Sequence, residues 1–362
     1  AEMPFMVAFA YTLDETNHFA DLLLPEAIEL ESTQLIHIGG TCGEEQFWES
    51  EGWALRQPVI APRGEARDFT WIATELAKRT GLSEAYYEKI NAGVLGSAPL
   101  KGPHHDFTLD PKQDHEVDEI WDAACRSASA LLSQGQDVHG LEWFKQHGFM
   151  TEPYSRLNWY LFPKIKEMGL RFELPYQERF RRVGLQLARR LHEAGAHWWD
   201  RQLEEYQALP EWTDVCKLWE DALERNFDVD IKDYPFWLLT SRSMQYSGGA
   251  NVTIPLINEL ADNVKGQDGI MINAKVARQR GIHDGDLIEV RSPVGATRAR
   301  ARPRQGIRPD VLIMVGQFGH WKTPLAKDKK RASLNDLVPM LLDTTDGMGA
   351  TNDMVKADVR LV

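Results

Sequence analysis

The pattern that most constrains the fold lies in the last third of the chain, from Tyr234 onward. Short apolar runs alternate there with tight-turn signals, and the predicted strands are residues 235–240, 287–290, 296–302, 308–315 and 355–362. A short helix capped by Asn273 and closed by Gly281 interrupts them, and Asp284-Gly285 predicts a tight turn. Several short strands with tight turns and one small helix predict a compact β-barrel, with a domain boundary near residue 230.

Residues 1–230 have a mixed pattern. Residues 5–11 are a predicted strand, and residues 22–24 are a predicted buried strand that Pro25 stops. Residues 68–80 predict a helix that Asp68 caps and Gly81 ends, and further helices are expected near 114–133 and 176–206. Residues 39–66 and the stretch 93–114 are predicted to be largely irregular. The expected fold class is mixed α/β, with an α/β region over 1–230 followed by a barrel over 231–362.

Charge and cysteine usage exclude several function classes. The net charge of −13 argues against a general nucleic-acid binder. No run of about 18 apolar residues is present, so no membrane insertion by a spanning helix is expected. The cysteines lie far apart and form no C-x-x-C pair, so they predict neither a zinc site nor a cluster: Cys42, Cys125 and Cys216. No metal ligands are predicted, because the histidines of the loop-like stretch lack tight ligand spacing: His104, His105 and His115.

A polar loop after the first barrel strand is the strongest candidate for ligand binding. The strand 235–240 runs into hydroxyl, guanidinium and amide side chains followed by two glycines: Thr240, Ser241, Arg242, Ser243, Gln245 and Tyr246. Hydroxyls and free backbone amides suit phosphate oxygens, and Arg242 offers a bidentate phosphate contact. Taken alone, this stretch is either a polar turn or a phosphate-binding loop.

The loop is the first of several motifs that occur in a defined order. It is followed by Ile272–Val290, by Arg308–Trp321 with its Gly-His-Trp end, by Leu334-Asn-Asp-Leu337, and by Val355–Val359. This ordered series resembles the C-terminal dinucleotide-binding domain of the molybdopterin oxidoreductases, the dimethyl-sulfoxide reductase family. The stretch 1–81 agrees with it through Asp14-Glu-Thr, Ala20–Pro25, Glu31 and Pro58–Pro62.

The resemblance implies a fold, a cofactor and a set of binding residues. In this family the last domain is a six-stranded double-psi β-barrel that holds part of two molybdopterin guanine dinucleotides carrying molybdenum or tungsten. By this resemblance, Thr240, Ser241, Arg242 and Ser243 match the loop that contacts a cofactor's phosphate and pterin region, and Gln245 and Tyr246 continue it. Gly319 and His320 match a loop near the metal-bound pterins, Asn335 matches the family's N-x-L asparagine, and Lys356 matches its terminal lysine.

The resemblance also implies what lies elsewhere. The iron–sulfur cysteines and the metal-ligating residue of the family's amino-terminal half cannot be placed in this sequence, so the catalytic residues stay unassigned and any [4Fe-4S] cluster is expected outside the chain. Cys42 is interpreted as a buried or incidental thiol. The chain is therefore interpreted as the C-terminal part of a catalytic subunit of an oxidoreductase, inactive by itself. The alternative is a free-standing, non-catalytic cofactor-binding or assembly subunit.

Within the family, the Gly-His-Trp and Leu-Asn-Asp-Leu segments favour the branch of polysulfide, thiosulfate and arsenate reductases and phenylacetyl-CoA:acceptor oxidoreductase. The partners that the resemblance implies are the remainder of the catalytic subunit, together with separate subunits for iron–sulfur electron transfer and for membrane anchoring. The sequence assigns neither the substrate, the metal nor the compartment, cytoplasmic or periplasmic.

A row of arginines is a separate feature of the predicted barrel. Residues Arg298, Arg300, Arg302 and Arg304 recur at a period of two, so on a regular strand their side chains share one face. This face is either paired with acids of the barrel or a docking face for an acidic partner or the rest of the chain.

Overall fold

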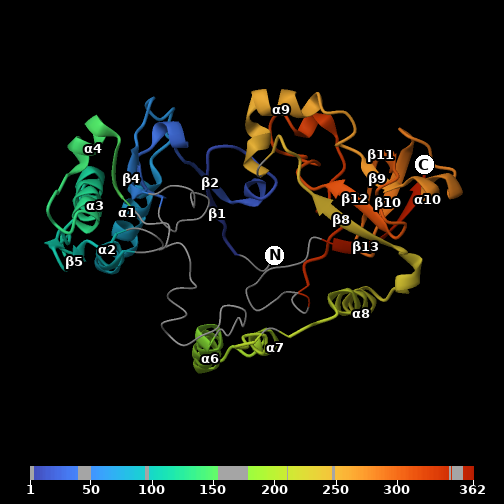
Figure 1. Cartoon of the computed structure of the whole chain (residues 1–362), viewed down its shortest axis with the longest axis horizontal. Helices are drawn as coiled ribbons and strands as arrows, with labels where there is room; N and C mark the ends of the chain where they lie inside the picture. The colour runs from blue at the N-terminus through green and yellow to red at the C-terminus, as the bar shows by residue number, and fades with distance from the viewer. Residues whose placement is uncertain are drawn as a thin grey trace. The chain divides into compact units, whose positions relative to one another are not determined.

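The structure, a computed structural model, describes residues 4–39, 50–93, 98–153, 178–209, 211–246, 249–341, 344 and 354–362 (Figure 1). The chain divides into two compact units. Unit 1 comprises residues 1–11 and 20–174, and unit 2 comprises residues 12–19 and 175–362. The short segment 12–19 therefore belongs to the same unit as the C-terminal part of the chain.

The centre of unit 2 is a closed six-stranded barrel (Figure 1). Its strands are β8 (Phe236–Ser241), β9 (Ile270–Asn273), β10 (Leu287–Arg291), β11 (Ala296–Arg304), β12 (Val311–Val315) and β13 (Met354–Leu361). They close in the order β10-β11-β9-β12-β8-β13, with the parallel pairs β11–β9 and β12–β8 and antiparallel pairing elsewhere. The predicted six-stranded barrel is confirmed; β9 is a strand that the sequence analysis did not predict.

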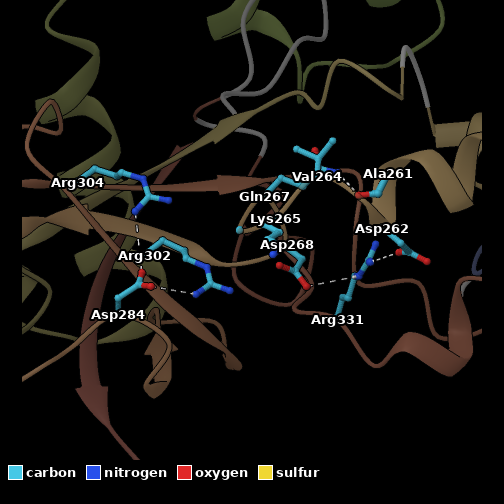
Figure 2. A pocket seen from close by; sticks show the side chains of 11 residues that line it. Ala261, Asp262, Val264, Lys265, Gln267, Asp268, Asp284, Arg302, Arg304 and Arg331 are labelled. Carbon is cyan, nitrogen blue, oxygen red and sulfur yellow. Dashed lines mark hydrogen bonds and ion pairs between the residues drawn. The ribbon is translucent and has the colours of Figure 1, made fainter.

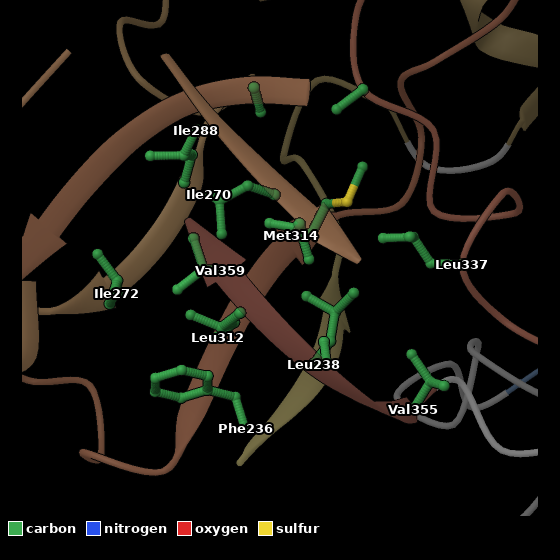
Figure 3. Close-up of a cluster of buried hydrophobic side chains, with 14 of the residues drawn as sticks. Phe236, Leu238, Ile270, Ile272, Ile288, Leu312, Met314, Leu337, Val355 and Val359 are labelled. Carbon is green, nitrogen blue, oxygen red and sulfur yellow. The ribbon is translucent and has the colours of Figure 1, made fainter. Parts of the chain in front are cut away.

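Side chains alternate between the two faces of each strand, and the inward-pointing side chains fill the barrel. Leu238, Ile270, Ile272, Ile288 and Leu312 are fully buried and point into its interior (Figure 3). Such a core removes apolar surface from water, at about 1.5–3 kcal/mol for each large aliphatic side chain. The barrel therefore provides a rigid base for the loops at its rims.

Helix α8 (Val215–Phe227) belongs to the same core, because its buried Trp219 and Leu223 join the barrel cluster. Unit 2 consequently starts well before residue 230, where the sequence analysis expected the boundary. Unit 2 also contains the helices α6 (Glu178–Glu193), α7 (Asp200–Leu203), α9 (Pro255–Asp262) and α10 (Ala274–Gln279).

The predicted helix boundaries of the barrel are borne out by local geometry. The Asn273 side chain accepts hydrogen bonds from the backbone N–H groups of Lys275 and Val276 at the start of α10. Gly281 adopts a φ of +70° at its end, and Ile282 packs behind it with 2% exposure. The expected helix over 176–206 is instead two helices, α6 and α7, because Gly195 adopts a φ of +73° between them.

Unit 1 combines a three-stranded antiparallel sheet with helices. The sheet has the order β3-β4-β7, formed by β3 (Gln34–Gly39), β4 (Ser50–Arg56) and β7 (Phe149–Pro153). The helices are α1 (Phe69–Thr80), α2 (Ser83–Ala92), α3 (Val117–Leu132) and α4 (Leu141–His147), and β5 (Lys101–Gly102) pairs with β6 (His105–Asp106). Helix α1 begins and ends as predicted, at the Asp68 cap and at Gly81. Strand β4 lies within the stretch predicted to be irregular.

The first strands of the chain form a small parallel pair, β1 (Val7–Ala10) and β2 (Leu22–Pro25). The predicted strands are present, but Val7, Leu22 and Leu23 are exposed within the described residues, at 39%, 43% and 42%. The strand 22–24, expected to be buried, is therefore largely uncovered here. No helix within the described ranges is long and apolar enough to cross a bilayer.

The arginine row lies on the outside of β11, as its period predicts, while Thr297, Ala299 and Ala301 point inward. Arg298 pairs with Glu289, Arg302 lies 3.6 Å and Arg304 4.0 Å from Asp284, and Arg300 donates to the Gly285 carbonyl. These contacts support the interpretation of a salt-bridged barrel face.

Candidate functional site

The candidate site begins where two neighbouring strands of the barrel end. Strands β8 and β12 run parallel with Met314 opposite Thr240 and Val315 opposite Ser241. Because both strands leave the barrel at the same rim, the loops that follow them lie side by side. The approach is close, since a Cβ atom on Gly316 would lie 2.6 Å from Thr240 Oγ1. The predicted loop 240–246 and the predicted Gly319–His320 loop are thus brought together.

Side-chain amides and a hydroxyl form a network at this rim, here called the Ser/Gln cluster: Ser243, Gln245, Gln267 and Gln317. The buried Ser243 Oγ lies 2.8 Å from Gln245 Oε1 and 3.0 Å from Gln267 Oε1. The backbone N–H of Ser243 donates to Gln317 Oε1 at 2.7 Å, and Gln317 Nε2 donates to the Tyr246 carbonyl. The cluster links three loops and presents neutral donors and acceptors.

The other predicted residues of the first loop differ in their surroundings. Arg242 is exposed, and Thr240 and Ser241 are half-buried at the strand end. Tyr246 is 1% exposed, its ring packs edge-on against Phe318 with centroids 5.6 Å apart, and burial raises the pKa of its hydroxyl. The Tyr246 ring is therefore part of a small apolar core beneath the loop, and its carbonyl is the part that faces the Ser/Gln cluster.

Glu15 holds the predicted Gly319–His320 loop. Its carboxylate accepts hydrogen bonds from the backbone N–H groups of Trp321, Lys322 and Thr323, and His320 Nδ1 lies 3.0 Å from Oε2. Burial by itself raises the pKa of Glu15, but the hydrogen bonds from His320, Thr323 and Lys322 outweigh it and hold the pKa well below its ordinary value. The loop therefore binds a carboxylate from the other end of the sequence that is ionised near neutral pH.

The remaining two predicted residues, Asn335 and Lys356, have different surroundings. Asn335 is exposed in the turn after Leu334. Lys356 of β13 pairs with Trp237 of β8, and Trp237 precedes Ser241 by four residues. Its ammonium contacts Glu220 at 3.1 Å and lies 4.7 Å from the Trp237 ring centroid. Within the described residues the structure does not bring Lys356 to the Ser/Gln cluster.

A charged cavity of about 410 Å³ adjoins the cluster through Gln267 (Figure 2). Its walls carry Lys265, Arg302, Arg304 and Arg331 against Asp262, Asp268 and Asp284. Arg331 lies between Asp262 and Asp268, and Asp284 faces Arg302 at 3.6 Å and Arg304 at 4.0 Å. The Arg302 Nε atom is buried without a hydrogen-bond partner among the described residues. The cavity has a small excess of positive charge next to the predicted loop.

Metal-capable side chains gather in a different place from the one considered in the sequence. Among the described residues, His192, His197 and Asp200 have ligand atoms within 4.8 Å of one another. His192 Nε2 lies 2.6 Å from Asp200 Oδ1, so these exposed side chains already pair with one another. His105 contacts the Ser127 hydroxyl, and His115 contacts the Asp110 carbonyl. Cys42 lies outside the described residues.

Comparison with known proteins matches the part of the chain that carries these loops to a domain family. A family model described as the molydopterin dinucleotide binding domain matches residues 236–355, from the start of β8 into β13. ArrA, the molybdopterin-containing subunit of the arsenate respiratory reductase of Chrysiogenes arsenatis, is 23% identical over 97% of this chain and 41% of its own length. PhsA, the molybdopterin-containing subunit of the thiosulfate reductase of Salmonella typhimurium, is 23% identical over 88% of this chain and 35% of its own. Residues 236–355 therefore match this domain family, and the chain as a whole is similar to molybdopterin-containing subunits of these reductases.

Two further proteins are similar to this chain. A sulfite dehydrogenase polypeptide of Allochromatium vinosum is 24% identical over 88% of this chain and 33% of its own length. The structure of acetylene hydratase from Pelobacter acetylenicus superposes with a TM-score of 0.54 over 99% of this chain and 41% of its own, at 13% identity, and shows the shared fold. The chain spans between a third and about two-fifths of the relatives it matches.

The residues present at the rim fit a molybdopterin dinucleotide. The edges of a pterin or a guanine present several donors and acceptors, and the Ser/Gln cluster offers amides and a hydroxyl of both kinds. A buried His320 Nε2 without a hydrogen-bond partner in the described residues is a further polar atom of the same rim. The arginines of the cavity provide charge suited to phosphate.

Sequence reasoning missed three contributors to this candidate site: Glu15, Gln267 and Gln317. Gln317 stands between Gly316 and Gly319 in a loop already singled out, so its neighbours were a usable signal. Glu15 lies in the quoted Asp14-Glu-Thr motif, but nothing local relates it to residue 320. Gln267 carries no motif, and only the fold brings it to Ser243.

Proposed function

We propose that the protein is a molybdenum or tungsten oxidoreductase in which this chain binds one side of a molybdopterin guanine dinucleotide cofactor. The observation that carries this proposal is the coincidence of the matched domain, residues 236–355, with a closed barrel whose rim collects the Ser/Gln cluster. The names of the relatives ArrA and PhsA as molybdopterin-containing subunits favour it over a free-standing assembly protein.

In this proposal, different residues of the rim bind different parts of the cofactor. The exposed Arg242 guanidinium meets phosphate oxygens, and Ser243 and Gln317 fix the loop backbone that carries it. Gln245 and His320 face the polar edge of the ring system, and Asn335 and Lys356 bind more distant parts of the cofactor. When bound, the cofactor supplies the metal at which two electrons, and in many reactions an oxygen atom, are exchanged.

The substrate and partner classes follow from the relatives. ArrA is named as an arsenate reductase and PhsA as a thiosulfate reductase, so we propose an arsenic or sulfur oxyanion, or a related sulfur compound, as substrate. We propose that the metal ligand, a [4Fe-4S] cluster and the catalytic residues lie outside this chain. Partners are the remainder of the catalytic subunit, together with separate subunits for iron–sulfur electron transfer and for membrane anchoring.

Metal and pterin analysis of the full-length protein tests the proposal. The wild type is expected to contain molybdenum or tungsten together with pterin. Arg242→Ala is expected to lower both, because a bidentate phosphate contact is lost. Arg308→Ala is the matched control, since Arg308 is an exposed arginine that pairs with Asp310. A wild-type protein without metal and pterin contradicts the function, and equal cofactor contents in the two variants contradict the role of Arg242.

A further inference from the structure

The Glu15 carboxylate at the rim accepts hydrogen bonds from several donors. Glu15 Oε1 accepts from the backbone N–H groups of Trp321, Lys322 and Thr323 at 2.9, 2.7 and 2.9 Å. Oε2 accepts from Thr323 Oγ1 at 2.8 Å and lies 3.0 Å from His320 Nδ1. Consecutive backbone N–H groups turned toward one point form a concave anion-binding nest. The segment 320–323, here called the nest, therefore holds an anion that the chain itself supplies.

The segment that carries Glu15 is itself held by local hydrogen bonds. Asp14 Oδ1 accepts from the backbone N–H groups of Thr16 and Asn17 at 2.8 and 2.7 Å. The buried Asn17 side chain in turn donates to the Thr12 carbonyl. His18 then packs edge-on against Trp321, with ring centroids 5.5 Å apart. Glu15 is thus held from its own side as well as by the nest, unlike a mobile surface acid.

The loop that presents the nest is equally constrained on its other side. Gly319 adopts a φ of +90°, and a Cβ atom there would lie 2.3 Å from Ser333 Cα and 2.5 Å from the Ala332 oxygen. The loop is therefore pressed against residues 332–333 while Glu15 holds its amides. Its position is decided by two contacts that come from distant parts of the sequence.

The contact also decides which ring nitrogen of His320 faces the carboxylate. The ring nitrogen that faces a carboxylate carries the proton, so Nδ1–H donates to Glu15. Nε2 is buried and has no hydrogen-bond partner within the described residues.

We propose that residues 320–323 are a carboxylate-binding nest occupied by Glu15, and that Glu15 is a positioning residue that holds His320 and its loop for the cofactor. The second half of this inference rests on the proposed function; the first does not. Glu15 acts through His320 and the loop backbone.

Hydrogen exchange of the full chain tests the nest without any cofactor. The amides of residues 321–323 are expected to exchange at least about tenfold faster in Glu15→Ala, as the loss of a charge-assisted hydrogen bond implies. Added acetate is expected to slow them again by filling the nest, whereas acetamide is not. Glu259→Ala, which removes an exposed glutamate of α9, is the control and should leave these amides unchanged. Unchanged exchange in Glu15→Ala, or no effect of acetate, overturns the nest.

The isosteric Glu15→Gln variant keeps the test decisive if Glu15→Ala does not fold. Its amide NH₂ can face His320 and donate to Nδ1, so the proton of the ring is expected to move to Nε2. Nitrogen-15 NMR of the histidine rings distinguishes the two tautomers. An unchanged tautomer in Glu15→Gln contradicts the role of Glu15 in orienting His320.

Cofactor retention in the full-length protein tests the link to function. Glu15→Ala and Glu15→Gln are expected to retain less metal and pterin than the wild type and than Glu259→Ala. If the wild type binds cofactor and the Glu15 variants bind it equally well, positioning by Glu15 is wrong. If the wild type binds none, the proposed function fails, while the exchange and acetate results still decide the nest.

Discussion

Replacement of Gly319 by alanine tests how tightly the loop of the candidate site is held. The added Cβ would lie 2.3 Å from Ser333 Cα and 2.5 Å from the Ala332 oxygen, and both are backbone atoms. Neither atom can rotate away, unlike the end of a flexible side chain. The residue also has a φ of +90°, a conformation that L-residues with a side chain rarely adopt.

The expected cost has two parts. The left-handed backbone conformation costs a non-glycine residue about 1–2 kcal/mol. Forcing an extra methyl into filled space adds about 1–3 kcal/mol through backbone shifts. Gly319→Ala should therefore lower the free energy of unfolding by about 2–5 kcal/mol. Gly281→Ala is the matched control, because Gly281 has a φ of +70° with nothing within 4 Å of its would-be Cβ, and only the first cost applies.

Urea unfolding of the full chain measures the difference. Hydrogen exchange in peptides from the barrel strands reads unit 2 separately from unit 1. The midpoint should shift further for Gly319→Ala than for Gly281→Ala, with an unchanged slope on denaturant. Equal losses of stability in the two variants would refute the reasoning, because the close approach of the loop to residues 332–333 would then contribute nothing.

Two further predictions concern titration. Burial raises the pKa of the Cys125 thiol to about 12, so iodoacetamide at about pH 8 should leave Cys125 unmodified and should label the exposed Cys216. Peptide mass spectrometry measures the labelling of each cysteine. Labelling of both cysteines contradicts the burial of Cys125. The folded-state pKa of Glu15 lies below its ordinary value of 4.5, so its stabilising contribution is complete above about pH 4.5 and is lost as the pH falls through the folded pKa. The loss of stability in Glu15→Gln should therefore be largest near pH 7 and shrink below about pH 4.5, and a difference that grows in acid contradicts this sign.

Local signals predicted much of unit 2. Asn273 and Gly281 mark the ends of α10 because a side-chain oxygen satisfies the first amides and glycine accepts the left-handed conformation. The alternation of arginine with small residues along 296–304 predicted the outward face of β11, since side chains alternate across a strand. The polar residues after β8 were also recognised as a candidate loop from their types alone.

Other features escaped because their causes are not local. Strand β4 occupies a stretch whose composition predicts irregular structure, since its pairing with β3 and β7 stabilises it more than its own residues do. Helix α8 joins the barrel core because its Trp219 and Leu223 pack against residues that follow them in the sequence. The burial of the Tyr246 ring in the apolar core under the loop likewise depends on residues that are distant in the sequence.

The sequence by itself determined which residue types stand at the ends of strands, where helices stop and which face of β11 is charged, because these depend on neighbours within a few residues. The tertiary structure decided which of these side chains meet. Ser243 joins Gln317 because β8 and β12 are parallel neighbours in the barrel. Glu15 reaches His320 across 305 residues of sequence, and a contact of that separation is encoded by the path of the whole chain, which no local pattern records.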